Sequence, residues 1–191
     1  MYRVFTNGNV LRRFLALWTL GFVCMYAAWS ISYRALPDGI LCGKFLVSQV
    51  QIITQELLST FSRILAYNIF FACVPLILAN LVRVKGIPLG YVLASYHWIL
   101  YGTLLGTNSF LIPTPSRLLP TAEILLYGTG IYEITAYTLI AAATYGITAH
   151  FEKGLFNARI NGFLRSEKIG LAISFALLAL SNFVEAWQIL S

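Results

Sequence analysis

The stretch FLALWTLGFVCMYAAWSISY, from Phe14 to Tyr33, contains no charged side chain. The hydrocarbon core of a bilayer is about 30 Å thick, and about 20 helical residues cross it. Only segments that satisfy their own backbone hydrogen bonds survive there, so this stretch predicts a transmembrane helix. It is longer than the apolar core of a secretory signal, which has about 7–15 residues, and we expect it to be retained.

The same pattern recurs along the rest of the chain. Long apolar runs also cover residues 64–82, 87–107, 122–149 and 169–190. Hydrophobic residues make up 59% of the chain and charged residues 10%, whereas soluble domains carry about 25% charged residues. The sequence therefore predicts an all-α membrane protein, one domain over 1–191 with five transmembrane helices, and argues against a soluble enzyme.

The segments between these runs carry weaker signals. Apolar residues recur at steps of three and four over about 41–63, which predicts an amphipathic helix. That helix would lie at the membrane interface and run into the second span, or pack on the protein's own surface outside the membrane; the pattern allows both. Prolines in 108–120 predict a non-helical connection. Apolar and charged residues mixed over 150–168 predict a short surface helix on the inner leaflet.

The basic residues predict an orientation, because Lys and Arg stay preferentially on the cytoplasmic side. With the N-terminus inside, nine of the 13 Lys and Arg residues fall on the cytoplasmic side and four outside. The nine are Arg3, Arg12, Arg13, Arg83, Lys85, Lys153, Arg159, Arg165 and Lys168; the four are Arg34, Lys44, Arg63 and Arg117. Five spans then place the C-terminus outside. The bases form no continuous stripe, so we expect membrane lipid and no nucleic acid as a partner.

Ionisable side chains at membrane depth are costly and therefore informative. His97 and Glu133 both fall near mid-membrane, and we expect them to share a buried polar cluster. Glu185, Asn68 and Arg63 are expected to form a second cluster nearer the outer face. Such clusters either fix helix packing through hydrogen bonds or line a path for protons or small solutes.

Small residues permit close helix approach inside a membrane. Gly86 with Gly90 and Gly102 with Gly106 form two small-xxx-small pairs at the ends of the third run, and Gly130 is a further predicted packing position. Pro75 interrupts the second run and should kink it, because proline has no N–H donor.

No pattern of soluble enzyme chemistry is present in the sequence. Cys24, Cys42 and Cys73 match neither a disulfide framework nor a metal motif. His97 and His150 lie far apart without cysteines or carboxylates at metal-binding spacing, so no zinc site is expected. There is no phosphate-cradling glycine loop and no nucleophile elbow. We therefore expect a non-enzymatic protein without cofactor, metal or catalytic residues.

Several short motifs occur in a recognisable order. They are Ile64-Leu-Ala-Tyr-Asn68 at the start of the second run, the glycines of the third, Leu119-Pro120 followed by Thr129-Gly130-Ile131-Tyr132-Glu133, and Glu185-Ala186. From about Ile64 to Ser191 this arrangement resembles the stage II sporulation protein M family of prokaryotic membrane proteins. The family's fourth span carries a His-Gly-x-x-Glu-like signature, and Thr129 stands in the place of that histidine here.

The resemblance implies a five-span, non-enzymatic protein of the cytoplasmic membrane. The expected function is that of a scaffold or accessory subunit that assembles with other membrane proteins or with further copies of itself. The competing hypothesis is a transporter or channel-like permease in which His97, Glu133 and Glu185 carry protons or small solutes.

Overall fold

The computed structural model describes residues 5–6, 8–42, 56–110, 114–152, 155–160 and 164–191, and these are mostly helical. The longest helices are α2 (Val10–Ala35), α5 (Leu89–Thr107) and α8 (Arg165–Leu190). The shorter helical segments are α3 (Leu57–Asn68), η2 (Ile69–Cys73), α4 (Val74–Asn80), α6 (Ala122–Tyr127) and α7 (Gly130–Ala143). Two antiparallel hairpins pair β1 (Arg83–Val84) with β2 (Ile87–Pro88), and β3 (Ile147–Glu152) with β4 (Leu155–Ile160).

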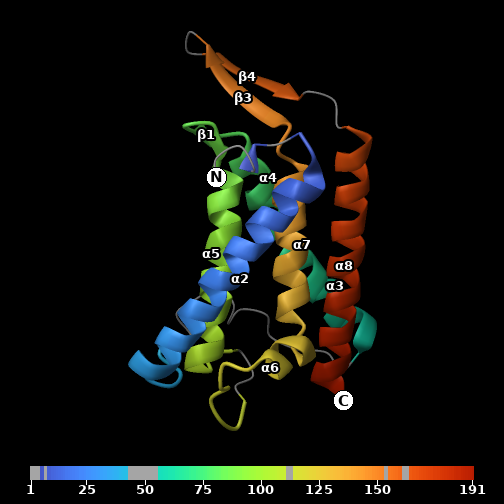
Figure 1. The fold of residues 1–191 in the computed structure, drawn as a ribbon. Helices are drawn as coiled ribbons and strands as arrows, with labels where there is room; N and C mark the ends of the chain where they lie inside the picture. The colour runs from blue at the N-terminus through green and yellow to red at the C-terminus, as the bar shows by residue number, and fades with distance from the viewer. Residues whose placement is uncertain (1–4, 7, 43–55, 111–113, 153–154, 161–163) are drawn as a thin grey trace.

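The chain runs back and forth along one bundle (Figure 1). It descends through α2, returns through α3 to α4, descends through α5, returns through α6 and α7, and descends through α8. The start of α2 and the end of α8 therefore lie at opposite ends of the bundle.

Three of the helical elements are long and apolar enough to cross a membrane: Val10–Ala35, Leu57–Asn80 and Arg165–Leu190. The expectation of five such helices is thus met only in part, and the small sheets depart from an all-α fold. Helix α7 has 14 residues, or about 21 Å at 1.5 Å per residue. Helix α5 is long enough but carries Tyr, Ser, His and Thr side chains. These side chains keep the hydropathy of α5 below that of the three other helices.

The fourth predicted span, 122–149, is not one helix. Helix α6 ends at Tyr127, α7 begins at Gly130, and the backbone of Gly128 between them is extended. Two glycines within three residues weaken the helix here, because glycine loses more backbone entropy on ordering than other residues. Helix α7 ends at Ala143, and the chain enters β3 at Ile147.

The predicted surface helix over 150–168 is also wrong. Residues 147–152 and 155–160 form the strands of the β3–β4 hairpin, in which Ile147 pairs with Ile160 and Phe151 with Phe156. Apolar residues alternate with polar ones at period two in β3, and that period matches a strand and not a helix. The rest of the segment starts α8 at Arg165, earlier than predicted, and the Glu167 carboxylate accepts a hydrogen bond from the Leu164 N–H.

The second predicted span begins earlier than expected. Most of the predicted amphipathic helix, residues 43–55, lies outside the described residues, whereas residues 57–63 belong to α3. From Leu57 to Asn80 the chain stays helical, with the π-helix η2 placed just before Pro75. Proline cannot bond to the carbonyl four residues back, and a π-turn is one way to accommodate that missing bond.

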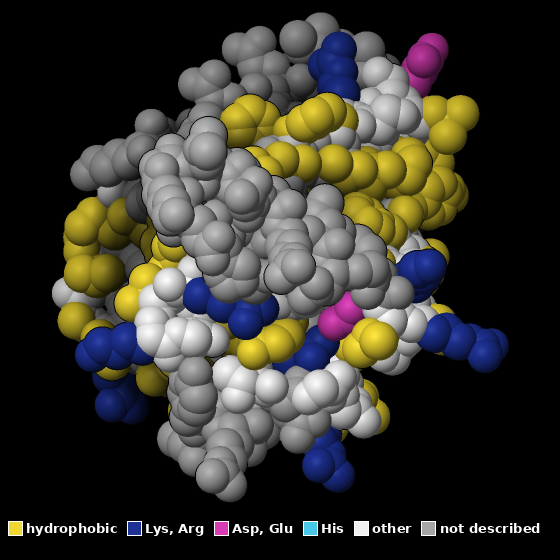
Figure 2. All heavy atoms as spheres, turned by 90° about the horizontal axis from the view of Figure 1, so that it is seen from above, with side chains coloured by type: hydrophobic (Ala, Val, Ile, Leu, Met, Phe, Trp, Pro, Cys, Tyr) yellow, Lys and Arg dark blue, Asp and Glu magenta, His cyan; other side chains and the backbone are white. Residues whose placement is uncertain are grey.

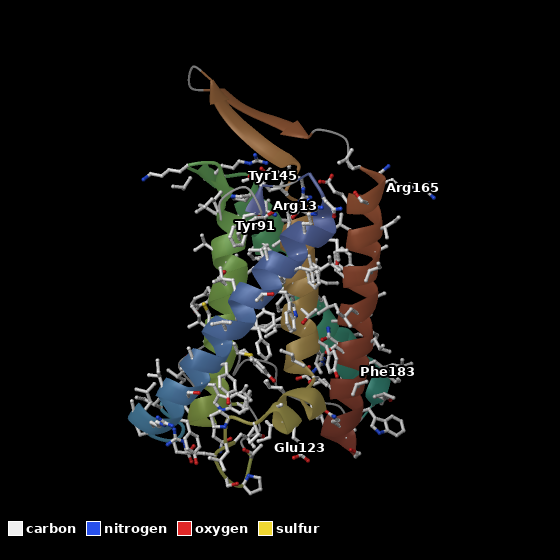
Figure 3. The ribbon with its side chains drawn as sticks, viewed as in Figure 1. Arg13, Tyr91, Glu123, Tyr145, Arg165 and Phe183 are labelled. Atoms are coloured by element: carbon white, nitrogen blue, oxygen red, sulfur yellow. The ribbon has the colours of Figure 1, made fainter. Side chains whose placement is uncertain are left out.

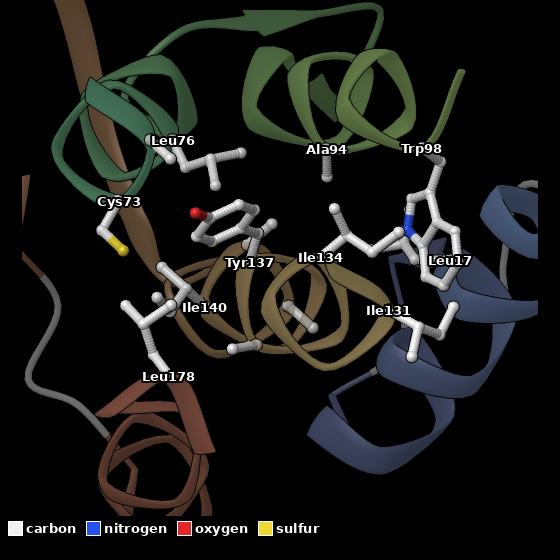
Figure 4. Packing of buried hydrophobic residues seen from close by; sticks show 14 of the residues in the cluster. Leu17, Cys73, Leu76, Ala94, Trp98, Ile131, Ile134, Tyr137, Ile140 and Leu178 are labelled. Carbon is white, nitrogen blue, oxygen red and sulfur yellow. The ribbon is translucent and has the colours of Figure 1, made fainter. Parts of the chain in front are cut away.

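Helices α2 and α5 meet backbone to backbone. A Cβ on Gly102 would collide with the Met25 carbonyl oxygen, and one on Gly106 with the backbone of Trp29. The indole N–H of Trp98 then crosses to α7 and donates to Thr138 Oγ1 at 2.8 Å. Figure 4 shows the same core from close by, with Trp98 turned toward Leu17 of α2 and other large side chains filling the space between helices.

The prediction of a non-helical connection over 108–120 is confirmed for its described part, because residues 108–110 and 114–121 form no helix. Asn108 ends α5 with φ at 48° and its side chain accepts from the Thr114 N–H at 2.9 Å. Asparagine tolerates this left-handed conformation better than most residues. Arg117 donates to the carbonyls of Gly106 and Ser32, which joins the ends of α5 and α2.

Candidate functional site: two polar centres in the bundle

The first centre joins three helical segments inside the bundle. Glu133 of α7 and Glu185 of α8 are in side-chain hydrogen-bond contact. Asn68, the last residue of α3, donates from Nδ2 to Glu133 Oε1 at 3.3 Å and to Asn182 Oδ1 at 2.9 Å. We call Asn68, Glu133, Asn182 and Glu185 the acid-pair centre.

The local structure of this centre is unusual in two ways. Asn68 lies directly before the π-helix Ile69–Cys73, and π-turns within α-helices occur frequently at functional sites. Asn182 is completely buried, yet within the described part of the chain its Nδ2 group has no hydrogen-bond partner. A buried donor without an acceptor costs free energy, so its retention calls for a reason.

The chemistry of the acid-pair centre follows from its two carboxyl groups. Carboxylates only accept hydrogen bonds, so a bond between Glu133 and Glu185 requires a proton on one of them. The Asn68 amide donates to Glu133 and therefore stabilises a negative charge on that carboxylate. The arrangement can therefore hold a proton between two helices inside the bundle.

The structure divides the predicted polar residues differently from the sequence analysis. Glu133 joins Glu185 and Asn68, which were expected in a separate cluster. His97 does not join Glu133: its Nδ1 lies 2.7 Å from the Leu93 carbonyl oxygen on its own helix, and its ring packs on Tyr137 at 5.3 Å between centroids. Arg63 lies exposed on α3. The rotation of each helix about its own axis decides which of these side chains meet. Equal depth along two spans does not decide it.

The predicted packing glycines also divide. Gly102 and Gly106 lie in the contact of α2 with α5, Gly90 meets Asn80 and Leu76 of α4, and Gly130 meets the Tyr101 ring. Gly86 is not in a helix. It lies in the two-residue turn between β1 and β2, where both Lys85 (φ 51°) and Gly86 (φ 82°) have positive φ. Such a turn favours glycine for its backbone freedom and not for helix packing.

The second centre lies at the end of the bundle where α2 and α8 begin. Arg13 is 1% exposed and Glu167 is 4% exposed. Arg13 Nη2 donates to Glu167 Oε1 at 3.1 Å, and its Nε donates to the Ala142 carbonyl oxygen at 3.1 Å. The guanidinium carbon of Arg13 lies 4.6 Å from the centre of the Tyr145 ring. We call Arg13, Glu167, Arg83, Tyr91 and Tyr145 the charge-paired centre.

Sequence reasoning missed this centre because it treated Arg13 as a flanking charge. The signal was present in the spacing of the buried face of α2, which contains Arg13, Leu17, Gly21, Met25 and Trp29 at steps of four. Arg12, its neighbour, is exposed. A basic residue in phase with the packing stripe of a span indicates an internal partner.

The charge-paired centre belongs to the basic end of the bundle, defined by Arg12, Arg13, Arg83, Lys85, Arg165 and Lys168. Figure 2 looks onto this end and shows Lys and Arg side chains distributed around it, with fewer Asp and Glu. Figure 3 shows Arg13, Tyr91 and Tyr145 close together there, while Arg165 points away from them.

The described residues offer little for a metal or redox cofactor. Within them, no three His, Cys, Asp or Glu side chains gather as metal ligands. Cys24, Cys42 and Cys73 are free thiols.

Comparison with known proteins adds no relative. No protein-family model, curated protein or solved structure matches this chain. The resemblance to the stage II sporulation protein M family therefore stays a prediction from motifs.

Proposed function

We propose that the chain is a multi-pass protein of a prokaryotic cytoplasmic membrane, with its N-terminus inside and its C-terminus outside. All five helical passes of the bundle would cross the bilayer. Three are long and apolar enough by themselves, and α7 is enclosed by α2, α4, α5 and α8. The outward faces support this placement, because Ile31 of α2 is 65% exposed and Leu180 of α8 is 64% exposed.

Within that membrane, we propose a non-enzymatic scaffold or accessory subunit that binds a partner membrane protein. The observation that carries this proposal is the outward face of α8. Six of its exposed residues follow each other at steps of four and three, the spacing with which one helix packs along another. They are Ile169, Ile173, Ala176, Leu180, Phe183 and Trp187.

The filled interior of the bundle also supports a scaffold. Trp29, Trp98, Met25, Leu76 and Ile140 are each at most 1% exposed and lie between helices. The motif resemblance to a family with a scaffolding member points the same way.

The test is recovery of a partner from native membranes in mild detergent. We expect wild-type protein to retain a membrane protein at fixed stoichiometry. Ala176→Trp, which places a large side chain on the α8 seam, should lose that companion. Ala27→Trp makes the same change on the exposed face of α2 and should keep it. Identical recovery by both variants, or no companion with wild type, would contradict the proposal.

A second candidate function is proton or small-solute transfer, and the acid-pair centre favours it. An ionisable pair inside a membrane is a functional hypothesis by default. Here Glu133 and Glu185 come from different helices, and helix movement would separate them.

Proteoliposomes that contain a pH-sensitive dye test this candidate. Transfer through the pair predicts a proton flux that Glu133→Gln and Glu185→Gln each abolish. Glu123→Gln, at an exposed position in α6, is the matched control and should leave the flux unchanged. Equal flux in all variants, or none above empty vesicles, would exclude this route.

A further inference from the structure

Two hydrogen-bond donors of the charge-paired centre have no acceptor among the residues that the structure describes. The hydroxyl of Tyr91, a residue that is 3% exposed, and Nε of Arg83 are both buried and unpartnered. The Tyr91 hydroxyl lies within electrostatic reach of Arg13, Arg83, Glu167 and Tyr145. A buried donor without an acceptor costs free energy. Two such donors in one centre indicate that an acceptor is missing there.

The charges of the centre do not balance. Its single carboxylate, Glu167, is already used, because Oε1 accepts from Arg13 and Oε2 accepts from the Leu164 N–H. Arg83 donates from Nη2 to the Tyr145 carbonyl, and its guanidinium carbon lies 4.4 Å from the Tyr145 ring centre. Among the described residues, no carboxylate lies within ion-pair distance of Arg83. The positive charge of the half-buried Arg83 is therefore left without a carboxylate partner among the described residues.

An anion with several acceptor oxygens would satisfy both unpartnered donors and the unbalanced charge. A phosphate group fits, since guanidinium and hydroxyl donors bind its oxygens through charge-assisted hydrogen bonds. The position of Arg83 indicates which molecule carries the phosphate, because Arg83 lies in β1, directly beyond the end of α4. In a membrane-spanning bundle this is the level of the lipid headgroups, where basic sites between helices bind anionic lipids.

We propose that Arg83 and Tyr91 form a phosphate-binding site, and that the phosphodiester of an anionic lipid headgroup occupies it. Arg83 Nε and the Tyr91 hydroxyl donate to phosphate oxygens, and the anion neutralises the Arg83 charge. Arg13 and Glu167 act as positioning residues, because their ion pair holds α2, α7 and α8 around the site. The lipid source rests on the proposed membrane placement, whereas the phosphate site does not.

The experiment titrates short-chain dihexanoylphosphatidylglycerol against the full-length protein in a neutral detergent and follows thermal unfolding. Wild type should show a saturable rise in Tm. Tyr91→Phe and Arg83→Gln should each need about tenfold more lipid for the same rise, the usual effect of one hydrogen bond to a charged group. Arg165→Gln changes an exposed base at the same end and should respond as wild type does.

Tyr91→Phe keeps this test independent of folding. The hydroxyl has no partner to lose, so the variant without lipid should unfold at the wild-type temperature or above it. Equal lipid responses in wild type, Tyr91→Phe and Arg83→Gln would overturn the proposal.

Inorganic phosphate in a parallel titration separates the two sources. A lipid site predicts no comparable shift with phosphate alone. An equal shift that depends on Arg83 and Tyr91 would support the phosphate site and overturn its assignment to lipid. Failure of the membrane placement would appear elsewhere, as protein that stays soluble without detergent or vesicles.

Discussion

The two polar centres hold glutamates in opposite ways. Glu167 faces a guanidinium and is held as one half of an ion pair, whereas Glu133 faces the carboxyl of Glu185. In the first case the charges cancel, and in the second a shared proton must replace the missing cation. The difference indicates that the charge-paired centre fixes the assembly of α2, α7 and α8, while the acid-pair centre keeps a group that can change its state.

Position in the bundle agrees with this contrast. The charge-paired centre lies at the basic end, where each of its partners starts or ends a helix or lies just beyond one. The acid-pair centre joins the first turn of α7 to the C-terminal part of α8, beside a π-helix. Arg13 and Glu167 are 1% and 4% exposed, whereas Glu133 and Glu185 are half-buried, so the ion pair is the more enclosed of the two.

The largest expected effect comes from breaking the ion pair. Arg13→Gln leaves the Glu167 charge buried without its partner and should destabilise the protein by about 3–5 kcal/mol. Reversible unfolding in mixed micelles of sodium dodecyl sulfate measures this cost. Arg12→Gln removes the neighbouring exposed charge and should change stability by at most about 0.5 kcal/mol.

The double variant Arg13→Gln/Glu167→Gln sharpens the result. It removes both charges, so its cost should be lower than that of Arg13→Gln alone. Additive costs in the same unfolding assay would show that the two side chains are not coupled.

A smaller effect is expected from the amide that supports the acid pair. Asn68→Ala removes the hydrogen bonds to Glu133 and Asn182 and should cost about 1–3 kcal/mol. Ser62→Ala is the control on the same helix, because that exposed hydroxyl donates to the Leu58 carbonyl within the helix itself. Equal stability of the two variants would mean that Asn68 does not hold α3 to α7 and α8.

The smallest effect on stability is expected at Glu133. The same substitution, Glu→Gln, is made in each polar centre, so that the two centres are compared directly. Glu133→Gln keeps a donor for Glu185 without requiring a proton, so stability should stay within about 1 kcal/mol of wild type. Glu167→Gln leaves Arg13 without a carboxylate and should approach the cost of Arg13→Gln. The ratio of the two unfolding free-energy changes is the measurement. A larger loss at Glu133 would reverse the proposed roles.

Sequence patterns found the outer helices and missed details inside the bundle. Helices α2 and α8 and the continuous segment 57–80 follow from long apolar runs, because lipid-facing surface must be apolar along its whole length. The sequence analysis did not predict the turn at Gly128 and Thr129 or the β3–β4 hairpin. By composition alone, the apolar residues there fit a helix, a strand or a loop equally well. The period of two over Ile147–Glu152 was the usable signal.

The polar residues show the same limit. Sequence identified Asn68, Glu133 and Glu185 as costly residues at membrane depth, and they do meet. It also paired His97 with Glu133 because their depths matched. Depth follows from counting residues, but which side chains face each other depends on how each helix is rotated about its axis.

The amino-acid sequence by itself determined that this chain favours long apolar helices and that few charges are buried among them. The tertiary structure decided which charges meet. Arg13 and Glu167 are separated by 154 positions, and only the packing of α2 and α8 around α7 brings them within 3.1 Å. Burial depends on one residue's polarity, whereas pairing depends on the relative rotation and spacing of whole helices, which close-packed side chains set together.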